Sequence, residues 1–277
     1  MADGPMPPGV PEVKSAARTI EVLELMAARG ARPLSIRELA EALGMPRSSA
    51  YALLQTLVRK GWVRCDASGS FYALGVRALL VGTSYIDRDP RATLARPFLD
   101  RLSETLDETT HFARLDGWDV VYLLTMESSR HRRPFARVGR RLPAHATALG
   151  KAVLAGHTVD DIDGSIPATL EVLTPQTIDT RKALLAELSA TRERGYAVDR
   201  EENTPGVCCV AMAFRYDDPP IDAFSCSIPA RRFTPDLELK VVDAMNDVRH
   251  EIEDICRAAD RHGLVWRYLP SGQIGAR

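Results

Sequence analysis

The stretch "SIRELAEALGMPRSSAYALLQTL", Ser35 to Leu57, decides the fold because it predicts two short helices joined by a tight turn. Apolar residues recur at helical spacing in its first half, and Ser35 with Glu38 forms a capping-box pattern. Gly44 favours the end of that helix because glycine tolerates a left-handed backbone. Pro46 suits the first turn of the next helix, where a missing N–H costs nothing. The pattern is typical of a helix-turn-helix.

Two features beside this stretch favour DNA binding over an ordinary helical hairpin with a solvated polar end. The second helix begins with short polar and cationic side chains where a recognition helix meets the major groove, namely Arg47, Ser48, Ser49 and Tyr51. After Lys60 and Gly61 stop this helix, "WVRCDASGSFYAL" predicts a β-hairpin that turns at residues 66–69. Helix, turn, helix and hairpin together predict a winged helix-turn-helix.

The charge distribution agrees with a DNA-binding head. Between Lys14 and Arg64 the chain has nine Lys or Arg against four Asp or Glu, although the whole chain has a net charge of −1. The remainder must therefore be acidic. A basic head on an acidic body is expected of a DNA-binding domain joined to a domain with another task.

The 277 residues predict two domains in a water-soluble chain. No apolar run approaches the roughly 20 residues that span a membrane. The start, "MADGPMPPGVPEV", has no basic stretch followed by an apolar core, so we expect no secretory signal and a cytoplasmic protein. Its proline and glycine content predicts a disordered leader.

The rest of the chain predicts a linker helix and an α+β domain. Residues 75–88 read as a mostly apolar helix, which we expect to pack on a partner subunit, on its own head, or on both. Helices then flank an antiparallel sheet, with a hairpin at Asp116-Gly117 and a last helix from Thr234-Pro235. The expected domains are a leader (1–13), a winged helix-turn-helix (14–74), a linker helix (75–89), an α+β domain (90–265) and a tail (266–277).

The cysteines exclude two site classes. Five cysteines in a chain of this kind argue against a disulfide framework. No CxxC pair occurs, so a structural zinc site of the usual spacing is not expected. We therefore predict neither a metal nor a cofactor.

Several motifs together resemble the isocitrate lyase regulator (IclR) family of bacterial transcription regulators. In the head they are "SAARTIEVLELMA", the helix-turn-helix itself and "YALGVRALLVG"; in the body they are "LPAHATALGKAVLA", "ERGYAVDREENTPGVCCVA" and "FSCSIPARRFTP". The resemblance covers nearly the whole chain after the leader. It implies a winged head, a linker helix, a GAF-like effector-binding body, and dimers or pairs of dimers on near-palindromic operators. It also implies small carboxylates or aromatic metabolites as effectors.

The expected DNA contacts lie in the helix-turn-helix and the wing. They are Ser35, Arg47, Ser48, Ser49, Tyr51, Gln55, Lys60 and Arg64. Arginine can read guanine and serine hydroxyls can hold phosphates, so we expect Arg47 and Tyr51 to carry most of the sequence reading. Lys60 and Arg64 either touch the DNA backbone or are simply solvated. Ala52 stands where the family often has a basic residue, which removes one contact.

The expected effector pocket follows from the resemblance. The resemblance carries over Gly150, Asp199, Val207, Cys209, Ser225 and Ser227, and it places His145 and Ala148 in the pocket segment before them. We expect Met126 and Leu142 as apolar walls. The helix after "LPAHATALG" would offer its N–H groups to an anion. Ser225 and Ser227 share a strand face by the two-residue alternation, which suits a carboxylate or hydroxylated ligand. Each residue also has a plain structural alternative, such as a solvated strand face or a buried thiol.

Two other functions compete with regulation by a metabolite. Cys209, His145 and Asp199 could form the nucleophile, base and orienter of a cysteine hydrolase, but an apolar strand gives the thiol nothing that activates it. A metal or thiol-redox sensor could use Cys208, Cys209, Cys226 and His145, but adjacent strand residues point to opposite faces. We therefore expect a regulator that is not an enzyme, and we favour a repressor over an activator. Its partners would be operator DNA, a small organic acid and further copies of itself as a homodimer or homotetramer.

The basic loop Arg130 to Arg133 is compatible with an anionic ligand or with solvation.

Overall fold

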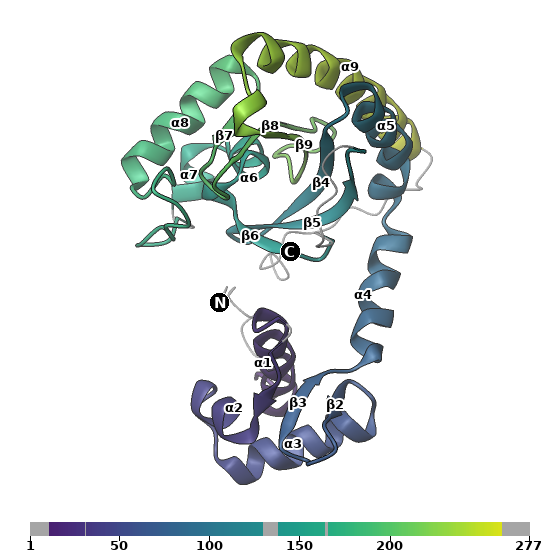
Figure 1. Cartoon of the computed structure of the whole chain (residues 1–277), viewed down its shortest axis with the longest axis vertical. Coiled ribbons are helices and arrows are strands. Elements are labelled where there is room, and N and C mark those ends of the chain that lie inside the picture. Colours follow the sequence, from purple (N-terminus) through teal and green to yellow (C-terminus); the bar gives the residue numbers. More distant parts are fainter. Residues whose placement is uncertain (1–10, 31, 130–137, 164–165, 262–277) are drawn as a thin grey trace. The chain divides into compact units, whose positions relative to one another are not determined.

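The computed structural model describes residues 11–30, 32–129, 138–163 and 166–261. The chain divides at Asp89 into two compact units, which we call the head (up to Arg88) and the body (from Asp89), each shown in Figure 1. Most of the expected leader, the whole expected tail and the basic loop Arg130 to Arg133 lie outside the described residues. Across the described ranges, every helix is too short or too polar to cross a lipid bilayer.

The head is a winged helix-turn-helix. Its helices are α1 (Lys14–Ala28), α2 (Ile36–Ala42) and α3 (Arg47–Arg59), and its strands are β1 (Leu34–Ser35), β2 (Val63–Cys65) and β3 (Phe71–Leu74). The strands form an antiparallel sheet in the order β1-β3-β2, of which β1 has no counterpart in the sequence prediction. The predicted capping box forms: Ser35 Oγ accepts from Glu38 N at 3.3 Å, and Glu38 Oε2 accepts from Ser35 N at 2.9 Å.

One apolar cluster holds the head together. Val22 from α1, Leu39 from α2, Leu54 from α3 and Tyr72 from β3 are all almost completely buried in it. The chain leaves the wing at Gly75, whose backbone lies very close to that of Gly61, which lies just after the end of α3. A Cβ atom on Gly75 would lie 2.3 Å from the carbonyl oxygen of Gly61. Only glycine fits there, so the path from the wing to the next helix is fixed.

The helix α4 (Val76–Arg88) has no buried residue. Val76, Leu79, Leu80 and Val81 are each more than half exposed. Scattered exposed apolar residues are ordinary on a protein surface, but here several lie on one helix. This is the linker helix of the sequence prediction.

The body contains a six-stranded antiparallel sheet in the order β6-β5-β4-β9-β8-β7. The strands are β4 (Thr109–Asp116), β5 (Asp119–Met126), β6 (Arg141–Pro143), β7 (Ala197–Arg200), β8 (Val207–Ala213) and β9 (Asp222–Pro229). The helices are α5 (Pro90–Leu106), α6 (Ala148–Leu154), α7 (Val159–Asp163), α8 (Arg181–Arg194) and α9 (Pro235–Arg261), with 3-10 turns at Ala144–Ala146 and Ala230–Arg232.

Helices cover both faces of this sheet. The face towards α6 and α8 carries small residues, including Ala113, Ala211 and Ala223, in one buried cluster with both helices. Their strand neighbours point to the other side, where the rings of Phe112 and Phe224 each contact Phe214. There α5 and α9 pack against each other and on the sheet (Figure 1). The observed fold is the predicted α+β body with GAF-like layering.

A buried ion network fixes the start of α5. Asp89 caps this helix by accepting from Ala92 N at 2.8 Å, and its carboxylate also pairs with Arg114 of β4. Arg114 Nε donates to Asp222 Oδ1 of β9 at 2.7 Å. Charges removed from water in this way need excellent geometry, and breaking one pair leaves the other charge uncompensated. The point where the body begins is therefore rigid.

Candidate functional site

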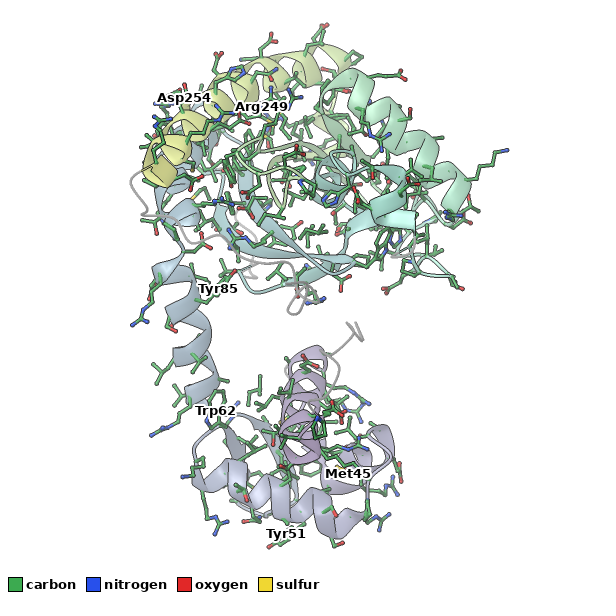
Figure 2. All side chains as sticks on the ribbon, turned by 180° about the vertical axis from the view of Figure 1, so that it is seen from behind. Met45, Tyr51, Trp62, Tyr85, Arg249 and Asp254 are labelled. Carbon is green, nitrogen blue, oxygen red and sulfur yellow. The ribbon has the colours of Figure 1, made fainter. Side chains whose placement is uncertain are left out.

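The exposed end of α3 presents the residues that the sequence assigns to DNA. Arg47, Ser48, Ser49 and Tyr51 are exposed on its first turns, whereas Ala50, Leu54 and Leu57 are buried in the head. Tyr51 is 52% exposed, and Figure 2 shows it at the surface of α3. Gln55 is half-buried on the same helix. A large aromatic ring held in water on this helix has no role in the core of the head.

The cations of this surface keep their charge available. Within the described ranges, Arg47, Lys60 and Arg64 form no ion pair, although Arg37 of α2 pairs with Glu41 at 3.7 Å. Unpaired cations on one surface are what the phosphates of a duplex require. Ser35 differs from them, because its hydroxyl is held in the capping box and serves α2 first.

The turn of the wing is a fixed structure. Asp66 accepts from the backbone N–H groups of Ser70 and Phe71, both at 2.9 Å, and from Ser68 Oγ at 2.6 Å. These hydrogen bonds stabilise the carboxylate, the Ser68 hydroxyl most, and lower the pKa of Asp66 to about 2. Arg64 on β2 is therefore presented from an ordered hairpin.

In the body, half of the predicted effector residues line one small cavity. The lining residues are Tyr122, Thr147, Ala148, Leu149, Asp199, Asn203, Thr204, Val207, Cys209 and Ser225. The cavity measures about 10 Å³, which is room for about one water molecule. A metabolite can enter only if the walls move apart, so ligand binding at this place must be coupled to a change in the body.

Strand register brings the polar lining together. Asp199 of β7 stands opposite Cys209 of β8, and Cys209 stands opposite Ser227 of β9. Cys209 Sγ and Ser227 Oγ are 3.2 Å apart. Ser225 lies two residues along β9 and so shares the face of Ser227. The row crosses β7, β8 and β9, the strands that α6 contacts most extensively.

Asp199 is the most perturbed group of the cavity. Its side chain is buried, and burial, followed by the charge of Glu202, raises its pKa to about 7. It accepts from Glu202 N at 2.6 Å. Near neutral pH this carboxyl therefore takes up and loses a proton, and in its protonated form it can donate a hydrogen bond to an anion.

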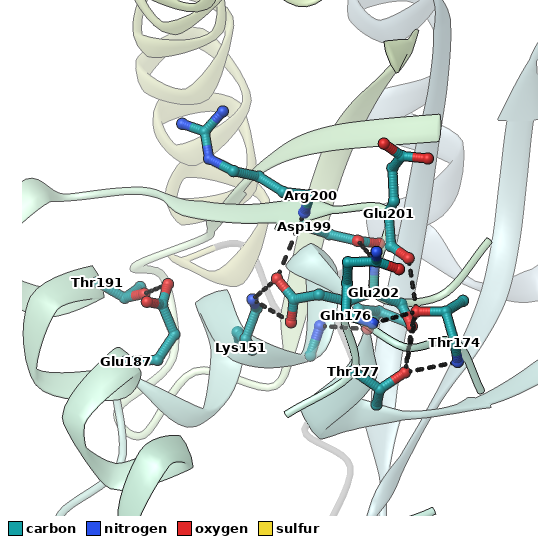
Figure 3. Close-up of polar contacts among 12 residues, drawn as sticks. Lys151, Thr174, Gln176, Thr177, Glu187, Thr191, Asp199, Arg200, Glu201 and Glu202 are labelled. Carbon is teal, nitrogen blue, oxygen red and sulfur yellow. Dashed lines mark hydrogen bonds and ion pairs between the residues drawn. The ribbon is translucent and has the colours of Figure 1, made fainter. Parts of the chain in front are cut away.

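A buried ion pair stands behind Asp199. Lys151 Nζ of α6 lies 2.6 and 2.7 Å from the two carboxylate oxygens of Glu202, as Figure 3 shows. The hydroxyl of Thr177 donates to the carbonyl oxygen of Glu202 at 2.6 Å, and that of Thr174 donates to the carbonyl oxygen of Glu201 at 2.8 Å. The loop after β7 is thus tied to α6 and to residues 174–177.

Sequence reasoning missed part of this arrangement. Lys151, Glu202, Asn203 and Thr204 were not among the predicted site residues. Glu202 to Thr204 lie in the motif "REENTPG", directly between two predicted pocket residues, and that position was the available signal. Lys151 gave no local signal, because a lysine on a helix usually points to solvent.

The other predicted effector residues do not line the cavity. Leu142 belongs to the apolar cluster under α6, and Met126 is buried at the end of β5. His145 Nε2 donates to the carbonyl oxygen of Glu171 at 3.0 Å. A Cβ atom on Gly150 would lie 2.2 Å from the carbonyl oxygen of Ala144, so this glycine is required by packing. Ser227 contacts the lining through Cys209.

The geometry bears on the two rival functions. His145 Nδ1 is buried without a hydrogen-bond partner in the described part of the chain, and Nε2 donates to the carbonyl oxygen of Glu171, so Nδ1 is not hydrogen-bonded to Cys209. Among the residues that the structure describes, no three His, Cys, Asp or Glu side chains are grouped to hold a metal ion.

A winged helix-turn-helix joined to a sheet domain with a small cavity defines a class, the transcription regulators controlled by a small molecule. Comparison with known proteins identifies the family. Residues 15–67 match the IclR helix-turn-helix domain, and residues 83–257 match the bacterial transcriptional regulator IclR C-terminal domain. The chain belongs to the IclR family of bacterial transcriptional regulators.

Individual relatives agree with this assignment. The chain is 33% identical to the HTH-type transcriptional regulator XynR of Escherichia coli K12, over 73% of this chain and 81% of that protein. It is 32% identical to the HTH-type transcriptional repressor AllR of Salmonella typhimurium LT2, over 85% and 87%. A solved IclR regulator from Alicyclobacillus acidocaldarius shares the fold, with a TM-score of 0.76 at 23% identity over 88% of this chain and 99% of that one.

Proposed function

We propose that this regulator is a repressor that dimerises, binds a near-palindromic operator through two heads, and responds to a small organic carboxylate bound beside Asp199. The observation that carries the effector assignment is the small cavity, whose walls include Asp199, Cys209 and Ser225. The relatives named as repressors, AllR among them, support the sign of regulation. The cytoplasm, where bacterial DNA lies, is the proposed location.

The cavity suits a carboxylate for a physical reason. A carboxylate that enters the cavity meets the Ser225 hydroxyl and the carboxyl of Asp199, whose pKa is raised to about 7. The protonated carboxyl donates a hydrogen bond to the incoming anion, whereas the ionised form repels it. We therefore expect effector affinity to fall as the pH rises through about 7.

The exposed apolar side of α4 supports dimerisation. Val76, Leu79 and Leu80 are each exposed by more than 60%. The same helix of a second copy offers the same apolar residues, and a self-complementary surface is what a two-fold interface requires. Two heads held in this way would meet two half-sites of a palindrome.

Effector control then follows as a population shift. Opening the cavity by a ligand favours one arrangement of the body. The body begins at Asp89, which the ion pair with Arg114 ties to the sheet, and α4 precedes it directly in the chain. A change in the sheet region can therefore be transmitted to the linker helix and to the spacing of the heads.

DNA selection from a random pool tests the head. After the preferred site is found, wild type, Arg47→Ala and the control Arg37→Ala are titrated against that site and against unrelated DNA. Arg47→Ala should weaken specific binding by roughly 5- to 150-fold, which corresponds to 1–3 kcal/mol for a base contact. Arg37→Ala, on α2, should bind as wild type does. Retention of full specific affinity by Arg47→Ala would overturn the assignment of α3 as recognition helix.

A thermal-shift screen with small organic, aromatic and sugar acids tests the body, because a ligand of the folded state raises its melting temperature. The acids that stabilise wild type are then titrated against the double variant Ser225→Ala with Ser227→Ala. A control variant, Ser189→Ala, removes an exposed hydroxyl of α8. The double variant should lose most of its affinity and the control none. Equal affinity in all three proteins would place the effector elsewhere.

A further inference from the structure

A second and much larger cavity lies in the body, apart from the effector cavity. It measures about 440 Å³, within the size range of small-molecule sites. Its walls come from the ends of α6 and α8, from residues 213–220 after β8, and from Arg249 of α9. The two cavities share no lining residue.

The most unusual group of this cavity is Arg249. Only 8% of the residue is exposed, and Figure 2 marks its place on α9. Nη2 donates to Asn246 Oδ1 at 3.0 Å, but Nε has no hydrogen-bond partner within the described residues. Arg249 also forms no ion pair there, although arginines are almost never fully buried without one. A buried guanidinium with an unused donor requires an acceptor.

Two further positive charges line the cavity and also favour a bound anion. Arg215 is exposed at the wall, and its positive charge adds to burial in lowering the pKa of Arg249. Arg192 donates to the carbonyl oxygens of Ala155 and His157, so its charge is not neutralised by these bonds. Three cations therefore line one space.

The carboxylates of the cavity do not cancel this charge. Asp217 is paired with Arg91 of α5, with Arg91 Nη2 donating to Asp217 Oδ1 at 2.9 Å. Asp218 is exposed to solvent. Glu253, which lies one turn after Arg249 on α9, accepts from Arg215 N at 2.7 Å and from Arg257 Nη2 at 2.8 Å. Asp218 therefore offsets one of the three positive charges of the cavity, and among the described residues no carboxylate forms an ion pair with Arg249.

We propose that this cavity is a second small-molecule site, which binds a compact oxyanion, the carboxylate or phosphate group of a metabolite, through Arg249 and Arg215. Arginine forks match the geometry of both anions. The bound anion would pair with the guanidinium of Arg249, which lines the cavity and forms no ion pair with the described residues. The same wall carries Asp217, whose charge is paired with Arg91 in the first turn of α5, where the body begins.

Calorimetric titration of the full-length protein tests this site. Inorganic phosphate and succinate are titrated in turn at matched ionic strength, with chloride as the reference salt. Wild type should bind at least one of the two more tightly than chloride. A response to phosphate alone identifies a phosphorylated ligand, and a response to succinate alone identifies a carboxylate.

Variants then locate the binding. Arg249→Gln should weaken binding at least tenfold, as expected for the loss of a charge-assisted hydrogen bond. Arg215→Gln alters an exposed side chain and should weaken binding several-fold; it decides the matter if Arg249→Gln fails to fold. Arg261→Gln, an exposed position on the same helix outside the cavity, should bind as wild type does. The proposal is overturned if neither anion binds wild type, or if Arg215→Gln and Arg249→Gln bind undiminished.

Discussion

Replacing Asp199 by asparagine should remove a large pH dependence from the stability of this protein. The burial of Asp199, with the charge of Glu202, raises its pKa from 3.8 to about 7. In the unfolded chain the carboxyl loses its proton near pH 4, so between about pH 4 and 7 the folded state holds a proton that the unfolded state has lost. The protonated carboxyl therefore stabilises the fold below pH 4, and this contribution is lost as the pH rises to about 7.

The magnitude follows from the two pKa values. Each pH unit between them corresponds to about 1.4 kcal/mol, so the difference of roughly three units gives about 4 kcal/mol. Asparagine keeps an oxygen that can accept from Glu202 N, as Asp199 Oδ1 does at 2.6 Å. The substitution should thus remove the titration while it preserves the local hydrogen bond. The free energy of unfolding of Asp199→Asn should therefore rise, relative to that of wild type, by about 1.4 kcal/mol per pH unit up to about pH 7. Above that pH the difference should increase little.

Urea denaturation of both proteins at half-unit steps from pH 5 to 8 measures this difference. The control is Asp161→Asn, because hydrogen bonds from Thr158 lower the pKa of Asp161 and keep it ionised throughout this range. The control should differ from wild type by the same amount at every pH. If Asp199→Asn also differed from wild type by a constant amount, Asp199 would be ionised in the folded protein at pH 5, and the account of the cavity would be wrong.

Three further substitutions probe contacts that stabilise the body or the head, each within its own domain. Lys151→Met should destabilise the body by about 3–5 kcal/mol, since it leaves the Glu202 charge buried without its partner, and urea denaturation measures this loss. Gly150→Ala should disrupt the body, because its Cβ would lie 2.2 Å from the carbonyl oxygen of Ala144; near-native circular dichroism and melting temperature would contradict this packing role. Ser35→Ala removes the helix cap and should cost the head about 1 kcal/mol, again by urea denaturation, with DNA affinity reduced only through that loss.

Several parts of this protein could be predicted from local sequence because their causes are local. The capping box at Ser35, the glycine at the end of α2 and the apolar spacing of α3 act within one or two helical turns. The hairpin at Asp116-Gly117 was predicted for the same reason, since a turn depends on its own residues. The effector residues required the family resemblance, because no local rule relates a strand residue to a ligand.

The remaining features depend on which residues the fold brings together. The sequence by itself determined the winged head, the linker helix and the alternation of the strands. Tertiary structure alone decided that Lys151 meets Glu202, 51 residues away, that the pKa of Asp199 is raised to about 7, and that Arg249 is buried at a cavity wall without an ion pair among the described residues. The physical reason is that a pKa or an unsatisfied charge depends on burial and on charges within a few ångströms, and these neighbours come from segments that are distant in the chain.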